Sequence, residues 1–369
     1  MRWWEYGVVV GVVLLVIGKE NSKVTAKGPG EGQSDLGIEE RKDRLFMKLR
    51  MLYDDKPQTT GAVCLDGSSP GFYYGGATEA KAAQSWIIFL EGGGWCYSEQ
   101  ECRDRSGTII GGSKNWHPQK NMGGPMWRDK RINPTFHNFN QVYIPYCDGG
   151  SFSGNRSEPL LVTSKEGGQQ KLYLRGHRIL YRVIEVLISD YGLNDATEVL
   201  LSGCSAGGLS VFIHCNEIGD LLHSINPNIK YRCMPGTGFF LDSPSAAGEN
   251  VFPDKIKNAF SLHEALGGTS EECRLRYPNA LWKCFLAEHT YLSAKYPMFI
   301  LNSAYDNWQI RCILGATRER CAGLGSFKGC IEDMNLCPLE ESKAIVGYGE
   351  LFIKRVDAAL ESHPVGHGA

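Results

Sequence analysis

The chain has 369 residues, 42% of them hydrophobic, which is enough to bury a large core as one large domain or two small ones. Its formal net charge of −2 at pH 7 gives no electrostatic reason to expect a nucleic acid or an anionic membrane as partner. Phosphate-binding Gly-Lys-Ser/Thr loops and zinc-type spacings of cysteine or histidine are both absent, so these patterns indicate neither nucleotide nor zinc binding.

The amino-terminal segment has the pattern of an export signal. An apolar stretch of about a dozen residues, Gly7 to Gly18, is shorter than the ~20 residues that a membrane-spanning helix needs. We expect residues 1–18 to be a signal peptide, with an uncleaved signal anchor as the alternative and as the one route to a membrane. Residues 19–55 are expected to be a flexible lead-in, and residues 56–369 to form the main domain.

Short apolar runs alternate with amphipathic ones along the main domain. Apolar residues at helical spacing predict a helix over Arg175–Tyr191, and a second helix begins near Leu209. This alternation predicts an α/β fold with a largely parallel central sheet and helices on both faces. The expected strands are Trp86–Leu90, Gln141–Ile144, Val199–Leu201 and Met298–Leu301.

A run of three glycines follows the first of these strands, in Glu91-Gly92-Gly93-Gly94-Trp95. Without side chains, the backbone N–H groups of such a loop can point into a site and stabilise a negatively charged oxygen. We therefore predict Gly93 and Gly94, together with the N–H of Ala206, as oxyanion-hole donors. The alternative is an ordinary turn after a strand.

Two segments match the pattern Gly-x-Ser-x-Gly, and their surroundings differ. Ser69 is followed by Pro70 and by no helical run, so we interpret it as a turn residue. Ser205, in Gly203–Gly207, lies between a strand and a helix. A sharp strand-to-helix turn needs small flanking residues and exposes the serine hydroxyl beside the positive end of the helix dipole. Ser205 is the predicted nucleophile.

An acid and a base must accompany a serine nucleophile. Asp306 comes shortly after the Met298–Leu301 strand and about 100 residues after Ser205, in the order typical of α/β-hydrolases, although an aspartate there can also be a helix cap. The base is harder to identify. Only His363 and His367 follow Asp306, in a short Gly-rich tail, and His214 falls within the helix after Ser205. We favour none of the three.

Thirteen cysteines indicate an exported chain with disulfides. Local spacing suggests the pairs Cys96–Cys102, Cys273–Cys284 and Cys330–Cys337, although sequence alone does not fix the connectivity. An odd count leaves at least one cysteine unpaired. We expect Cys204, buried beside the nucleophile, to be the free one.

Five sequence blocks in the same order resemble the pectin acetylesterase and Notum family, and look closest to its plant pectin acetylesterase branch. The resemblance spans roughly residues 60 to 355. Its blocks are Ala62–Gly67, Leu90–Cys96, Tyr146–Gly154, Ser202–Leu209 and Ala304–Gln309.

The resemblance implies an α/β-hydrolase fold and hydrolysis of O-acetyl esters, without a metal or an organic cofactor. Ser205 matches the family nucleophile, Asp306 its acid, and Gly93, Gly94 and Ala206 its oxyanion positions. Cys64 and Cys147 match two cysteines that look like disulfide partners. Two departures stand out: the family's histidine-bearing carboxyl-terminal block is missing, and Gly236 replaces a usual aspartate.

Three hypotheses follow. The first is a secreted, monomeric serine carboxylesterase of the cell wall that acts on an acetylated polysaccharide such as pectin. The second is a catalytically impaired hydrolase-fold protein that binds glycans or a protein partner, because loss of a catalytic histidine lowers turnover by up to ~10⁶-fold. The third is a Notum-like deacylase of a lipidated protein, which would need a deeper apolar pocket beside Ser205.

Overall fold

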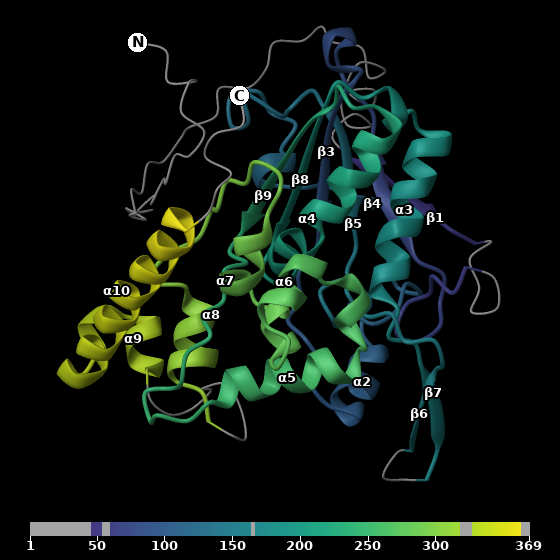
Figure 1. Ribbon diagram of the computed structural model, residues 1–369. Helices are drawn as coiled ribbons and strands as arrows, with labels where there is room; N and C mark the ends of the chain where they lie inside the picture. The colour runs from purple at the N-terminus through teal and green to yellow at the C-terminus, as the bar shows by residue number, and fades with distance from the viewer. Residues whose placement is uncertain (1–45, 54–59, 164–166, 318–326, 363–369) are drawn as a thin grey trace, which may run out of the picture.

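A computed structural model describes residues 46–53, 60–163, 167–317 and 327–362, and Figure 1 shows their arrangement. The expected signal segment, most of the expected lead-in and the tail with His363 and His367 lie outside the described residues. Among the helices that are described, none combines the length and the apolar composition needed to cross a bilayer.

A seven-stranded mixed sheet forms the centre of the molecule, in the order β4-β1-β2-β5-β3-β8-β9. Strands β5, β3, β8 and β9 are parallel, whereas β2, β1 and β4 extend the sheet in antiparallel pairing. The strand bounds are β1 Met47–Met51, β2 Gly71–Gly75, β3 Ser85–Leu90, β4 Gln119–Lys120, β5 Asn140–Ile144, β8 Glu198–Cys204 and β9 Lys230–Gly236.

The two halves of the sheet differ in sequence as their surroundings require. Strand β3 is a continuous apolar run and is covered on both faces, as is usual for a parallel strand. Strand β1 alternates apolar and charged residues, which suits a strand with one exposed face. Since β1 lies within residues 19–55, the sheet begins earlier than the predicted boundary at residue 56.

The predicted strand over Met298–Leu301 is reduced to two isolated parallel bridges. Met298 pairs with Cys233 and Leu301 pairs with Gly236, so the segment lies beside β9 without forming a regular strand. Its carboxyl end therefore meets the same sheet edge as the ends of β3, β8 and β9.

Helices α3 (Gly176–Asp190) and α4 (Ala206–Ile225) pack over one face of the sheet (Figure 1). The opposite face of β3 and β5 is covered instead by a largely irregular segment that includes Met126, Phe136 and Phe139. A β-hairpin projects from the body. The remaining elements are β6 Leu160–Thr163, β7 Gln169–Leu172, α2 Glu99–Ser106, α5 Val251–Leu262, α6 Glu271–Arg276, α7 Ala287–Thr290, α8 Asn307–Gln309, α9 Lys328–Glu332 and α10 Leu339–Glu361.

The three disulfides predicted from local spacing, Cys96–Cys102, Cys273–Cys284 and Cys330–Cys337, are confirmed, as is the Cys64–Cys147 pair that the resemblance implied. The Cys215–Cys233 disulfide, which joins α4 to β9, was not predicted. Cys204 is free as expected, but the prediction that it is buried is wrong: its side chain is exposed at the end of β8.

Candidate active site

Ser205 lies in the turn between β8 and α4, where its backbone adopts φ 59° and ψ −124°. This left-handed conformation is strained for a residue with a side chain, and strain of this kind is concentrated at functional sites. Ser205 is half-buried, and its side chain does not cap its own helix. The hydroxyl is thus not engaged by the helix that follows it.

The glycines around Ser205 are required by close backbone approach. A Cβ added at Gly207 would lie 2.1 Å from the carbonyl oxygen of Leu90. At Gly203 it would lie 2.4 Å from the Gly207 oxygen, and at Gly208 2.2 Å from the Gly236 oxygen. No side chain fits at these distances, so the small residues of the pattern allow β3, β8, β9 and α4 to converge here.

Gly236, which stands where the family pattern has an aspartate, contributes its backbone to the turn. Its carbonyl oxygen accepts a hydrogen bond from the Ser205 N–H at 3.0 Å. The neighbouring Thr237, at φ 45°, also accepts from the Ser205 N–H, at 3.1 Å through its side-chain oxygen. Together the two contacts fix the peptide that precedes the serine side chain.

The glycine loop after β3 lies directly against this turn. A Cβ at Gly92 would be 2.9 Å from the Ser205 Cβ and 3.1 Å from the Ala206 nitrogen. The backbone N–H groups of Gly93, Gly94 and Ala206 have no hydrogen-bond acceptor among the described residues. Unpaired N–H groups close to a serine are what an oxyanion hole requires.

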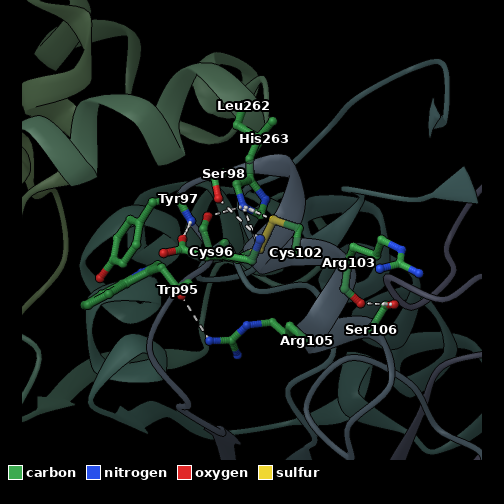
Figure 2. Close-up of a disulfide and its surroundings, with 12 residues drawn as sticks. Trp95, Cys96, Tyr97, Ser98, Cys102, Arg103, Arg105, Ser106, Leu262 and His263 are labelled. Carbon is green, nitrogen blue, oxygen red and sulfur yellow. Dashed lines mark hydrogen bonds between the residues drawn. A yellow bond between two sulfur atoms is a disulfide. The ribbon is translucent and has the colours of Figure 1, made fainter. Parts of the chain in front are cut away.

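The far end of the glycine loop is anchored by α2. The Cys96–Cys102 disulfide ties the loop to that helix, and Arg105 donates a hydrogen bond to the Trp95 carbonyl at 3.1 Å (Figure 2). The buried ring of His263 lies against the disulfide and contacts the Cys96 carbonyl oxygen at 3.2 Å. The loop is therefore held by covalent, polar and packing contacts.

A second loop, residues 146–154, connects the glycine loop to the serine turn. The Tyr146 hydroxyl donates to the Gly94 carbonyl at 2.9 Å and accepts from the Ser151 N–H. The Ser151 hydroxyl accepts from the Trp95 indole at 2.8 Å and donates to the Ala206 carbonyl at 2.7 Å. Sequence analysis assigned no site role to these residues, although the resemblance included their block.

Asp148 holds this second loop in its conformation. Its buried carboxylate accepts hydrogen bonds from the N–H groups of Gly150, at 3.0 Å, and Phe152, at 2.9 Å. Ser151 and Phe152 both have positive φ, so the loop needs such support. Burial raises the pKa of the Asp148 carboxyl to about 7, against the opposing effect of these hydrogen bonds.

Asp306 lies at the start of α8 and caps it, accepting from the Gln309 N–H at 2.8 Å. The helix-cap alternative is thus part of its role. Burial raises the pKa of the Asp306 carboxyl. Trp308, two residues later, packs edge-to-face on Trp95 of the glycine loop with ring centroids 5.6 Å apart. Asp306 therefore belongs to the same edge of the sheet as Ser205.

No histidine among the described residues hydrogen-bonds to Ser205 or Asp306. His214 is fully buried within α4, and His263 lies behind the Cys96–Cys102 disulfide. His289 contacts Asp242 at 3.1 Å and the Tyr277 hydroxyl at 3.2 Å. Among the described residues, Asp306 thus lies at the same sheet edge as Ser205 and the glycine loop, and no histidine is hydrogen-bonded to either side chain.

Comparisons with known proteins show what the chain is similar to. It matches the pectinacetylesterase family over residues 41–367. It is 30% identical to pectin acetylesterase 7 of Arabidopsis thaliana over 295 residues, 80% of this chain and 71% of that one, and 30% identical to pectin acetylesterase 4 of the same plant over 96% of this chain and 80% of that one.

A second group of relatives carries the name Notum. The palmitoleoyl-protein carboxylesterase NOTUM of Schmidtea mediterranea is 30% identical over 76% of this chain and 52% of its own length. A solved structure of the Wnt deacylase Notum from Drosophila superposes with a TM-score of 0.68 and 27% identity, covering 84% of this chain and 81% of that one. This similarity confirms the predicted α/β-hydrolase fold.

Proposed function

The chain belongs to the pectinacetylesterase family, and from that premise we propose that it is a serine carboxylesterase that hydrolyses O-acetyl esters of a polysaccharide such as pectin. The observation that carries the serine mechanism is the backbone of Ser205, held at φ 59° by glycines that admit no side chain. Strained, tightly supported turns of this kind present a nucleophile.

In the proposed reaction, the Ser205 Oγ attacks the acetyl carbonyl carbon and loses its proton to a general base. The N–H groups of Ala206, Gly93 and Gly94 stabilise the negative charge on the carbonyl oxygen, an effect worth ~10²–10³-fold in turnover for one donor. The sugar alcohol leaves with the proton, and water then hydrolyses the acetyl-serine ester. Asp306 orients the base.

A cluster of aromatic side chains lies between the glycine loop and α8 and bears on the size of the acyl group. Trp95, Phe240 and Trp308 contact each other edge-to-face at centroid distances of 5.0 to 5.6 Å. Phe252 packs on the same group. Rings packed this closely beside the glycine loop would suit a small acyl group, so we favour acetyl over a palmitoleoyl-type group.

We also propose a secreted, cell-wall location and a monomeric state. Five disulfides among the described residues suit an oxidising compartment, because cytosolic proteins rarely keep disulfides. The predicted signal segment, residues 1–18, agrees with this location.

The test is reaction with a fluorophosphonate probe, combined with acetate release from acetylated pectin. We expect Ser205→Ala to abolish both, while Ser69→Ala, the matched serine of the other Gly-x-Ser-x-Gly segment, leaves both unchanged. Release of acetyl rather than palmitoleoyl groups would support the acetyl preference, and the reverse would favour the Notum-like alternative.

The base is found by the same assay on His289→Ala, His363→Ala and His367→Ala. Loss of labelling in one of them assigns the base to that residue. A folded wild-type chain that neither reacts with the probe nor releases acetate would contradict the proposal and favour a hydrolase-fold binding protein.

A further inference from the structure

Two histidines and a glutamate form a cluster between α3 and α4, outside the proposed active site. His177 comes from α3, whereas His214 and Glu217 are three residues apart on α4 and so share a face of that helix. One donor atom from each lies within 4.8 Å of the other two. His177 Nε2 and Glu217 Oε2 are already 3.3 Å apart.

His214 is the unexplained member of this cluster. Its side chain is fully buried, and neither ring nitrogen has a hydrogen-bond partner of normal geometry among the residues that the structure describes. The backbone carbonyls of Ser151 and Phe152 lie beside the ring.

The simplest alternative is a surface ion pair next to a core histidine. It explains the contact between His177 and Glu217 but leaves both nitrogens of His214 unpaired. A buried polar group without a partner destabilises the folded state, so such a group calls for a ligand or another explanation. The ring of Tyr181 stacks on His177 at 4.3 Å, and its hydroxyl lies beside the Glu217 carboxylate.

The cluster lies next to a surface groove and is closely packed on its other sides. Glu217 is exposed and lines a groove of about 480 Å³ together with Asp220, Gly268 and Lys295. Gly268 packs against the cluster, since an added Cβ there would lie 3.3 Å from both imidazole rings.

We propose that His177, His214 and Glu217 bind a Zn²⁺ ion that joins α3 to α4. Two imidazoles and a carboxylate are a common donor set for this ion, with water from the groove as the fourth ligand. Tetrahedral ligands about 2.0–2.1 Å from zinc lie roughly 3.3 Å from each other, the separation that His177 and Glu217 already show. His214 completes the set with a small side-chain movement.

The sequence gives no indication of this site, because its donors do not follow a known zinc spacing. His177 and His214 are separated by the whole of β8 and the serine turn. The site would hold α4 nine residues beyond Ser205 and so support the helix whose first turn carries the proposed oxyanion donor. It is independent of the esterase proposal, and its tests do not use activity.

The test is Zn²⁺ titration of the untagged full chain after removal of metals with EDTA, followed by isothermal calorimetry. We expect one tightly bound Zn²⁺ that raises the midpoint of thermal unfolding. His177→Gln and Glu217→Gln should each weaken binding by at least about tenfold. Both side chains lie partly or wholly at the surface, so the variants should fold.

His117→Gln and Glu185→Gln serve as matched controls, because they remove exposed groups outside the cluster. Replacement by Co²⁺ adds a direct readout, since tetrahedral Co²⁺ absorbs visible light strongly. Absence of stoichiometric Zn²⁺ binding, or equal binding by the wild type and the two cluster variants, would overturn the proposal.

Discussion

Helix α4 carries two regions that are built in opposite ways. Its first turn depends on backbone: glycines pack against neighbouring strands, and the N–H groups of Gly93, Gly94 and Ala206 have no acceptor within the described part of the chain. Its middle depends on side chains, because His214 and Glu217 meet His177 of another helix. The loop of residues 146–154 contacts both, through Ser151 to Ala206 and through the carbonyls beside His214. The glycines of the first region leave no room for a side chain, whereas the second region should accept substitution but lose a donor of the proposed zinc site.

The largest effect is expected at the first turn. Gly207→Ala places a Cβ 2.1 Å from the Leu90 oxygen and 2.6 Å from the Glu91 oxygen, both backbone atoms that cannot move aside. We expect a loss of more than about 3 kcal/mol in the free energy of unfolding and loss of fluorophosphonate labelling. Chemical denaturation measures the first and gel fluorescence the second.

Gly347→Ala is the matched control, since an added Cβ on this exposed position of α10 meets nothing within 4 Å. It should leave stability unchanged or raise it by up to about 1 kcal/mol. If Gly207→Ala were equally harmless, the packing account of the serine turn would be wrong.

The next effect tests the loop that joins the two regions. The folded-state pKa of Asp148 is raised to about 7, so the folded chain binds more protons than the unfolded chain between pH 4 and 7. Stability on this account falls as pH rises through that window, by roughly 2–3 kcal/mol between pH 5 and 8. Asp148→Asn should remove this fall. Urea unfolding at pH 5 and at pH 8 measures this difference. If wild type and variant lost the same stability between the two pH values, the prediction would be wrong.

A smaller effect of opposite sign is expected at the middle of α4. The pKa of His214 is lowered to about 3, so its contribution to stability is complete above pH 6.5 and is lost as pH falls. Between pH 7 and 5 the loss is roughly 2 kcal/mol. In EDTA, the His214→Leu variant should lose less stability between pH 7 and 5 than wild type does. The exposed control variant, His117→Gln, should lose as much as wild type. His263, with a pKa lowered to about 4, keeps some acid sensitivity in every variant.

The sequence predicts the first region far better than the second. The Ser205 turn follows from residues that are adjacent in the chain, so a local pattern contains its geometry. The parallel strands β3, β5 and β8 and the helix α3 are likewise confirmed, because each is a continuous apolar or periodic segment. Short strands such as β4, with two residues, give no such signal.

What sequence could not supply is contact between distant elements. The Cys215–Cys233 pairing depends on α4 lying over β9, and the cluster around His214 depends on α3 lying beside α4. Cys204 was expected to be buried because it flanks a tight turn, but the end of β8 leaves its side chain exposed. Side chains alternate between the two faces of a strand. Only the fold decides which face is exposed, and therefore whether the residue before the nucleophile faces solvent.

The smallest effect is expected at that cysteine. Cys204→Ser keeps a hydroxyl within reach of Thr237, whose side chain is 3.1 Å from the Cys204 sulfur, and should change stability by less than about 0.5 kcal/mol. Mass spectrometry after native treatment with iodoacetamide should show alkylation at position 204 in wild type only. Protection of Cys204 from the reagent would contradict its exposure.

The bond between Cys215 and Cys233 has a consequence for how the protein must be made. It closes a short stretch of 18 residues between the helix that follows the serine and the neighbouring strand, and such a link typically adds about 2–4 kcal/mol. A bacterial cytosol rich in glutathione would leave both thiols reduced and the helix held only by packing. Soluble material should therefore come from periplasmic or yeast secretion, and because both cysteines are buried, dithiothreitol should reduce this bond only when the protein opens.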